Sequence, residues 1–291
     1  MPIPRDVEVE VVEIQSKPSS SGATGTVGRA AALEAQLRGA QVTLAMRNTK
    51  KPIPGFTSEL EKKLGFTRVQ ADLSDTKAGI THVVLLSSFC VTENGSAKLS
   101  SEADEILAVV HGKAELALAE SGVAYTVIRP AYFSSNIQML EDWEEVKSGQ
   151  LELAHPDAPF DYLAPEDVGA LAGARIAAKP PSSELIISQC GPELLSQRAA
   201  WKVVSEGLGM NISIKEINSD EHREKLRSRG FPEPMIKSAV ERLADLGRDP
   251  ASLYEPETHK EASMNFSKYT GRQPTTFKAW VDKHREELLA N

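Results

Sequence analysis

Short apolar runs alternate with helical segments in the first half of this chain, and this alternation restricts the possible folds most. The strongest run, THVVLLSS (81–88), has a continuous apolar centre, which is typical of a parallel strand covered on both faces. The run VAYTVIRP (123–130) has the same character and ends at Pro130. Between them, residues 100–122 predict a long helix that stops at Gly122. This order indicates βαβ units and a doubly wound parallel α/β sheet.

The rest of the chain extends this pattern and then departs from it. Three further runs predict short strands, and they are QVTLAM (41–46), FTRVQADL (66–73) and ELIISQ (184–189). Residues 160–178 predict a turn followed by a helix with small residues on its packing face, and the chain after Gly191 is mostly helical and polar. We therefore expect a doubly wound core over 1–131, to which 160–190 return, and a smaller, mainly helical lobe over 132–291.

Three evenly spaced glycines, Gly22, Gly25 and Gly28, precede a predicted helix. Glycine lets backbone N–H groups approach a pyrophosphate, and the N-terminus of the helix adds partial positive charge. Such a triplet also occurs in flexible loops, but the helix and strand that follow it favour a dinucleotide site. The turn follows the polar stretch SKPSSS (16–21) instead of a buried strand. Either VEVEVVEI (7–14) supplies the first strand through an extended linker, or the sheet lacks its central strand.

The residues after the second predicted strand indicate which dinucleotide is preferred. An acidic residue there binds the ribose 2′-hydroxyl of NAD, whereas an arginine accommodates the 2′-phosphate of NADP. This chain has Arg47 followed by Asn48 and no acid at that point. An arginine can pair with a phosphate through two hydrogen bonds. The pattern favours NADP(H), the alternative being that Arg47 is an ordinary surface cation.

Several segments together resemble the NmrA-like branch of the atypical short-chain dehydrogenase/reductases. They are GATGTVG (22–28), LAMRN (44–48), ADLSD (71–75), HVVLLSS (82–88) and HGKAELALAESGVAYTVIRPAYFSSNI (111–137). The run from LIISQCGPELLS (185–196) onward is also similar to fungal members of the agroclavine/festuclavine synthase type. The resemblance implies a Rossmann core that binds NADP(H), a substrate cleft between core and lobe, and a role in fungal secondary metabolism.

The resemblance also implies roles for individual residues. The dinucleotide phosphates would lie against the glycine turn, that is, Gly22, Thr24, Gly25, Thr26, Val27 and Gly28. Arg47 would meet the 2′-phosphate, and Asp72 and Leu73 would flank the adenine. Ser87 and Ser88 would end the central strand near the nicotinamide, and Lys113 would contact the ribose or the substrate.

This chain departs from the family pattern in its catalytic pair. The Tyr-x-x-x-Lys pair is absent because the position four before Lys113 is Val109, so no lysine-activated phenol can protonate a carbonyl oxygen. The catalytic candidates that remain are Lys113, His111 and Tyr132. The respective alternatives are a solvated helix lysine, a surface histidine and an aromatic wall residue.

A second departure lies between ADLSD and THVVLLSS, which only TKAGI (76–80) separates. A βαβ crossover needs at least about 10–12 residues. We therefore expect one sheet strand and its flanking helices to be missing between 75 and 81.

Composition narrows the class of protein. The net charge is −8 and no basic stripe is present, which argues against nucleic acid as a partner. No apolar run reaches the roughly 20 residues that span a bilayer. Cys90 and Cys190 form neither a metal-ligand spacing nor a disulfide framework, which favours the cytoplasm and predicts no metal.

The leading hypothesis is an NADP(H)-dependent oxidoreductase that transfers hydride to an iminium, enone or carbonyl carbon of a small organic substrate. An iminium carbon is reduced by hydride alone, so the missing tyrosine would cost little. The first alternative is a non-catalytic NADP-binding sensor that docks on a protein partner. The second is a truncated chain with impaired cofactor binding.

Overall fold

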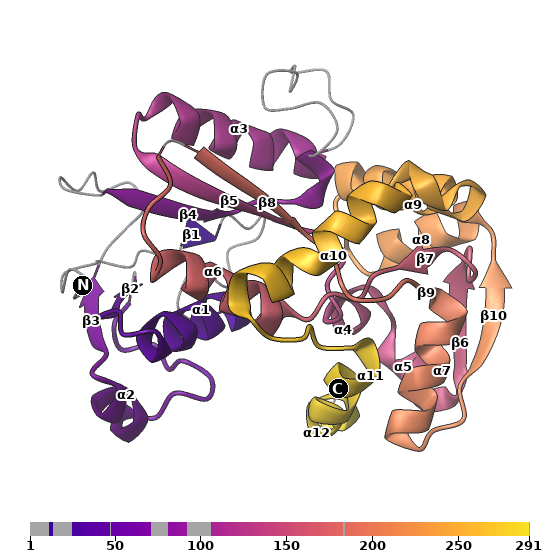
Figure 1. Ribbon diagram of the computed structural model, residues 1–291. Coiled ribbons are helices and arrows are strands. Elements are labelled where there is room, and N and C mark those ends of the chain that lie inside the picture. Colours follow the sequence, from indigo (N-terminus) through magenta and orange to yellow (C-terminus); the bar gives the residue numbers. More distant parts are fainter. Residues whose placement is uncertain are drawn as a thin grey trace.

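A parallel β-sheet with helices on both faces forms the core of the protein. The computed structural model describes residues 12–13, 25–46, 48–70, 81–91, 106–182 and 184–290. Four hydrogen-bonded strands lie in the order β1-β4-β5-β8 (Figure 1), with bounds Val12–Glu13, His82–Leu86, Ala124–Pro130 and Glu184–Gln189. A separate parallel pair joins β2 (Thr43–Met46) to β3 (Thr67–Gln70). The predicted α/β class with a parallel sheet is confirmed.

The run VEVEVVEI contributes the strand beside β4. Val12 lies opposite Leu85 and Glu13 lies opposite Leu86 in a parallel register. The run VEVEVVEI therefore supplies a strand of the sheet, as the first of the two possibilities requires, whereas the predicted linker SKPSSS lies outside the described residues. The expected gap between 75 and 81 falls outside the described residues except for Thr81. Among the described strands, β4 pairs directly with β1.

Alternate residues of the central strands point to opposite helical layers. Figure 1 shows α3 (Ile106–Glu120) on one face of the sheet and α1 (Thr26–Leu37) with α6 (Pro165–Ile176) on the other. Leu85 and Val127 pack toward α3, whereas Val84 and Ile128 belong to the core cluster shared with α1 and α6. This period of two on a sheet buried on both faces produces the continuous apolar runs of the sequence.

Helices α1 and α6 approach so closely that only glycine fits between them. A Cβ atom on Gly169 would lie 2.4 Å from the carbonyl oxygen of Val27, and one on Gly173 would lie 2.4 Å from that of Ala31. This close approach confirms the small-residue packing face that the sequence predicts for 160–178.

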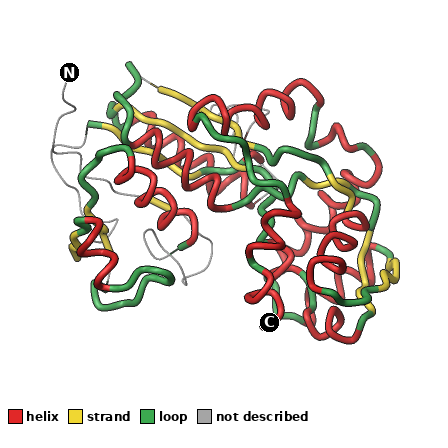
Figure 2. Tube along the Cα trace, turned by 60° about the horizontal axis from the view of Figure 1, so that its bottom comes forward, coloured by secondary structure: helices red, strands yellow, loops and turns green. Residues whose placement is uncertain are grey.

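The remaining elements are mainly helical and build the lobe beside the sheet (Figures 1 and 2). After β5 come α4 (Asn136–Leu140), α5 (Trp143–Ser148), β6 (Gln150–Ala154) and β7 (Pro159–Phe160), and after β8 come β9 (Leu195–Ser196), α7 (Gln197–Leu208), β10 (Ser213–Ile217), α8 (Ser219–Ser228), α9 (Glu233–Arg248), α10 (Pro256–Thr270), α11 (Phe277–Lys283) and α12 (Arg285–Ala290). The short α2 (Ser58–Leu64) lies between β2 and β3 in the sequence. Trp143, Trp201 and Trp280 are all buried in the core of the lobe.

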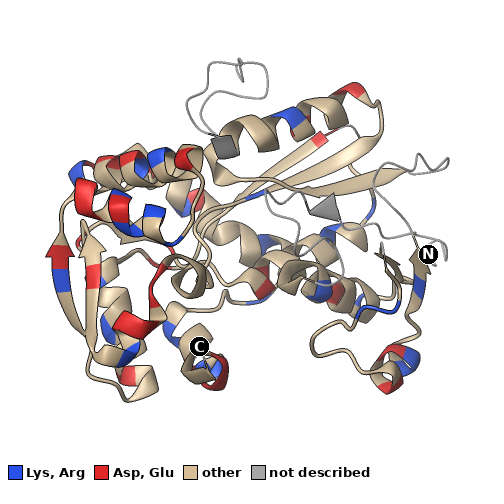
Figure 3. Cartoon of the chain, turned by 180° about the vertical axis from the view of Figure 1, so that it is seen from behind, with Lys and Arg blue, Asp and Glu red and all other residues tan. Residues whose placement is uncertain are grey.

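Helix α10 connects the lobe to the core. It packs on both α6 and β8, and Figure 1 shows it running from the lobe to the sheet layer. The boundary predicted at 131/132 stays a prediction. Positively and negatively charged residues are interspersed along the helices of the lobe (Figure 3). Within the described ranges, no helix combines the length and the apolarity needed to cross a bilayer.

Candidate active site

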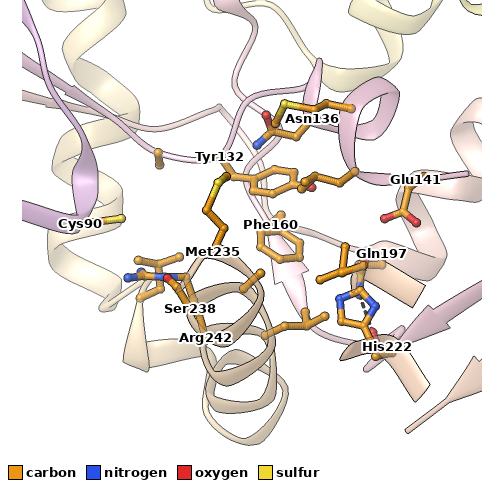
Figure 4. A pocket seen from close by; sticks show the side chains of 18 of the residues that line it. Cys90, Tyr132, Asn136, Glu141, Phe160, Gln197, His222, Met235, Ser238 and Arg242 are labelled. Atoms are coloured by element: carbon orange, nitrogen blue, oxygen red, sulfur yellow. Dashed lines mark hydrogen bonds between the residues drawn. The ribbon is translucent and has the colours of Figure 1, made fainter. Parts of the chain in front are cut away.

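A cavity of about 270 Å³ lies where the carboxyl ends of β4 and β5 meet the lobe. Open α/β sheets bind their ligands at the carboxyl ends of the strands. The lining of the cavity is largely apolar, and Figure 4 shows the polar exceptions among the labelled residues. Ser88 and Cys90 follow β4, Pro130 and Tyr132 belong to the end of β5, and the remaining wall comes from the lobe. The pocket thus has the position and composition of a binding site for a small apolar molecule.

The aromatic rings of Tyr132 and Phe160 pack together and form one wall of the pocket. The ring of Tyr132 lies 4.1 Å from that of Phe160, centroid to centroid, and contacts Tyr162 edge-on at 5.6 Å. Burial raises the pKa of the Tyr132 phenol above its usual value. A less acidic phenol is a poorer proton donor. The packing of Tyr132 therefore fits the aromatic-wall interpretation, and its role as a proton donor stays a prediction.

Polar side chains line two opposite sides of the cavity. Figure 4 shows Cys90, Ser238 and Arg242 on one side, and Glu141, Gln197 and His222 on the other. Sequence reasoning missed the second group entirely. These residues are scattered over α7, α8 and the end of α4, and only the folded lobe brings them together.

Glu141 is held at the end of α4 by an arginine of the lobe. The Arg229 guanidinium donates to the backbone carbonyls of Met139 at 3.0 Å and Glu141 at 3.1 Å, and also to that of Leu140. Burial raises the pKa of the Glu141 carboxyl to about 7, although the nearby positive charges of Lys225 and Arg229 oppose the shift. Glu141 is thus a carboxyl group that retains its proton up to about neutral pH.

His222 lies on the same side and is neutral. Burial lowers the pKa of its imidazole to about 4, and the charge of Lys225 acts in the same direction. Its Nδ1 atom is buried and has no hydrogen-bond partner among the described residues.

The pKa of Glu141 leads to a pH-dependent stability prediction. Because the folded pKa of about 7 lies above the usual 4.5, the carboxyl stabilises the fold fully below pH 4.5, and this contribution is lost as pH rises through 7. As the pH rises from about 4.5 to about 8, we expect the parent to lose about 1–3 kcal/mol of unfolding free energy relative to Glu141→Gln, whose side chain does not titrate. Urea unfolding at a series of pH values measures this difference. Glu144→Gln, at an exposed carboxylate of α5, is the control and should show no such trend.

A buried ionic group fixes the strand ends that border the pocket. The Glu115 carboxylate on α3 accepts hydrogen bonds from Arg129 Nε at 3.0 Å and Nη2 at 2.6 Å, and from the Ser87 hydroxyl. Glu115 is only 3% exposed and Arg129 only 6%. The group ties β4 and β5 to α3 immediately before Ser88 and Pro130.

A second buried carboxylate holds the opposite side of the β5 end. Asp161 accepts hydrogen bonds from the Tyr132 backbone N–H at 2.9 Å, the Tyr254 hydroxyl at 2.7 Å and the Gly191 N–H at 2.7 Å. Burial raises the pKa of Asp161 to about 6 despite these donors. A Cβ atom on Gly191 would lie 1.9 Å from the Asp161 carbonyl oxygen, so only glycine is possible there. Asp161 thereby positions the aromatic wall of the pocket.

The predicted cofactor residues are only partly described. Gly25 caps α1 without a side-chain hydrogen bond, and Thr26, Val27 and Gly28 form the first turn. Gly22, Thr24, Arg47, Asp72 and Leu73 lie outside the described residues. Ser88 lines the pocket, whereas the Ser87 hydroxyl is buried and donates to Glu115. The positions of both serines near a nicotinamide stay a prediction.

The predicted catalytic residues are not brought together. Lys113 is exposed on α3, and neither it nor His111 lines the pocket, whereas Tyr132 does. Burial lowers the pKa of His111, which leaves a neutral ring that is a poor acid. The catalytic roles of Lys113 and His111 stay predictions. Cys90, two residues beyond Ser88, is half-buried and lines the cavity.

Comparison with known proteins supports the resemblance inferred from the sequence. The chain is 27% identical to a nitrogen metabolite regulation-like protein of Gibberella fujikuroi, over 90% of this chain and 94% of the relative. It is 24% identical to an agroclavine dehydrogenase of Claviceps fusiformis, over 72% of this chain and 67% of the relative. No family model matches the chain.

Solved structures share the fold. An NADPH-dependent quinone oxidoreductase of Escherichia coli in complex with NADPH aligns with a TM-score of 0.66 at 20% identity, covering 93% of this chain and 98% of that one. The negative transcriptional regulator NmrA in complex with NAD aligns with a TM-score of 0.66 at 16% identity, covering 99% and 98%. The expected NmrA-like resemblance is confirmed, and the proteins similar to this chain include both oxidoreductases and a regulator.

Proposed function

Starting from this NmrA-like resemblance, we propose that the protein is an NADP(H)-dependent oxidoreductase acting on a small apolar molecule. The hydride acceptor would be an iminium, enone or carbonyl carbon. The observation that carries the proposal is the apolar cavity at the carboxyl ends of β4 and β5, beside the position where this fold places a nicotinamide. A pure dinucleotide sensor has no need for such a cavity.

Among the described residues, the N-terminus of α1 fits a dinucleotide. The first turn of α1 contains no acidic residue, and its N-cap, Gly25, has no side chain that could occupy the backbone N–H groups of that turn. Both features suit a pyrophosphate at the helix N-terminus. When bound, NADPH would supply the hydride. The aromatic wall of Tyr132 and Phe160 would orient the substrate and exclude water, and the cytoplasm would supply the reduced cofactor.

A second candidate function is that of a dinucleotide-binding regulator with a protein partner. Two observations favour it. The NmrA structure that aligns with this chain is described as a negative transcriptional regulator. In addition, Lys113 lies on the surface of α3 and does not line the pocket, so that it is not placed to activate Tyr132. A chain with impaired cofactor binding is the third possibility.

One titration separates these candidates. Purified protein is titrated with NADPH and with NADH while nicotinamide fluorescence is followed, and iminium and enone compounds are then added. Oxidation of bound NADPH supports the enzyme. Binding without turnover over a broad set of compounds favours the regulator. Absence of binding at high micromolar concentrations leaves the third possibility.

The preference for NADP depends on Arg47. We expect Arg47→Ala to weaken NADPH binding about 10- to 100-fold, the equivalent of one charge-assisted contact, and to change NADH binding little. Dissociation constants from the fluorescence titration measure both effects. Lys51→Ala, at an exposed lysine nearby, is the control. Equal losses for the two cofactors would show that Arg47 does not contact the 2′-phosphate.

A further inference from the structure

The far side of the pocket holds two polar groups with unused hydrogen-bonding capacity. The Glu141 carboxyl forms no hydrogen bond or ion pair with the residues that the structure describes, and only desolvation and more distant charges act on it. Within the same residues, the Nδ1 atom of His222 is buried and unpaired. The unpaired Nδ1 atom of His222 costs free energy because it is buried, whereas Glu141 is half-buried and its carboxyl is open to a partner. A ligand that supplies a matching polar atom would recover that cost.

The charges around Glu141 favour an uncharged ligand. Lys225 on α8 forms an ion pair with Glu145 of α5 at 2.7 Å, so this pair is neutral overall. Arg229 donates to backbone carbonyls and leaves an unbalanced positive charge, while Asp142 adds a negative one. At about pH 6 the Glu141 carboxyl, with a pKa of about 7, is mostly protonated, and the His222 ring, with a pKa of about 4, is neutral. An incoming cation would therefore lack a counter-charge in the pocket itself.

We propose that Glu141 and His222 bind an uncharged carbonyl oxygen at one end of an otherwise apolar substrate. The carboxyl O–H donates to this oxygen, and His222 donates a second hydrogen bond from Nδ1 in the tautomer protonated there. The remainder of the substrate packs on Tyr132 and Phe160. This inference rests on the proposed function for its orientation, because it places the reacting carbon at the opposite side, toward Ser88 and Cys90.

The arrangement defines a substrate class. It is an uncharged, largely apolar molecule with a ketone, ester or amide oxygen remote from the carbon that accepts hydride. Of the hydride acceptors proposed above, this class includes the enone and the carbonyl compound and excludes the cationic iminium. The donors recognise the oxygen and not the reacting centre, so they act as specificity-determining groups. Glu141 and His222 would affect hydride transfer only by positioning the substrate.

Binding of three naphthalene compounds tests the proposal. The probes are 2-acetylnaphthalene, 2-ethylnaphthalene, which has nearly the same shape without the oxygen, and 1-(2-naphthyl)ethylammonium, which carries a charge. Calorimetric titration of the full chain at about pH 6, without cofactor, measures the three affinities. We expect the ketone to bind about 3- to 10-fold more tightly than the hydrocarbon, as one or two uncharged hydrogen bonds predict, and the cation to bind most weakly.

Variants of Glu141 identify the group responsible. Glu141→Leu should reduce the affinity for the ketone to that for the hydrocarbon. Glu141→Gln keeps an N–H donor and should retain the preference. At about pH 8.5 the preference should shrink in the parent, because Glu141 ionises, but persist in Glu141→Gln. Glu144→Leu, at an exposed carboxylate outside the pocket, is the matched control.

Several outcomes would overturn the proposal. They are equal affinities for the ketone and the hydrocarbon, tighter binding of the ammonium compound, or a preference that survives in Glu141→Leu. Failure of all three probes to bind would overturn it too. Because the measurement needs no cofactor, a chain that prefers the ketone but does not bind NADPH refutes the oxidoreductase function and leaves the recognition site standing.

Discussion

Replacement of Arg129 by Met is expected to lower the free energy of unfolding by about 3–5 kcal/mol. The guanidinium is buried and forms two hydrogen bonds with the Glu115 carboxylate, at 3.0 and 2.6 Å. Its removal leaves a carboxylate that is 3% exposed without a counter-charge. Urea unfolding followed by tryptophan fluorescence measures the loss.

Two comparisons show whether the buried charge causes this effect. The double variant Arg129→Met/Glu115→Leu removes both charges and should recover most of the stability, because apolar replacement of a whole buried pair is often close to neutral. Arg198→Met removes an exposed pair with Asp157 and should cost no more than about 1 kcal/mol. A loss of similar size in Arg129→Met and Arg198→Met would contradict the structural role assigned to Arg129.

The core could be predicted because its pattern is local. Strands β4 and β5 and helix α6 lie within the predicted segments 81–88, 123–130 and 160–178, since a sheet buried on both faces requires continuous apolar runs and a close helix pair requires small residues. The N-terminus of α6 has no side-chain cap, since Ala164 precedes the helix, and the Asp167 carboxylate accepts hydrogen bonds from Thr275.

The lobe could be predicted only as mainly helical. The strands β6 and β10 were missed, although Leu151 and Leu153 are buried on either side of the half-buried Glu152, and this alternation was a readable signal. Glu141 and His222 carry no such signal. Each is an ordinary polar residue in its own segment, and its role depends on contacts between elements far apart in the sequence. Sequence reasoning therefore located the strand ends of the site but not the wall that faces them.

The close contact between α1 and α6 leads to the second large effect. We expect the variant Gly169→Ala/Gly173→Ala to lose at least about 3 kcal/mol of unfolding free energy, since each overpacked position costs roughly 1–3 kcal/mol. Each added Cβ atom would lie 2.4 Å from a backbone carbonyl oxygen of α1, which no side-chain rotation can relieve. The two helices must separate, although alanine itself favours a helix.

Gly207→Ala on α7 is the matched control. Its Cβ atom would meet a side-chain atom of Val281 at 2.7 Å, and a side chain can move aside more readily than a backbone carbonyl. The gain in helix propensity, about 1 kcal/mol, should offset most of the remaining clash. If the α6 double variant were as stable as this control, the close helix contact would not exist in solution. Because the N-terminus of α1 is the proposed phosphate site, the double variant should also bind NADPH more weakly, whereas Gly207→Ala should not.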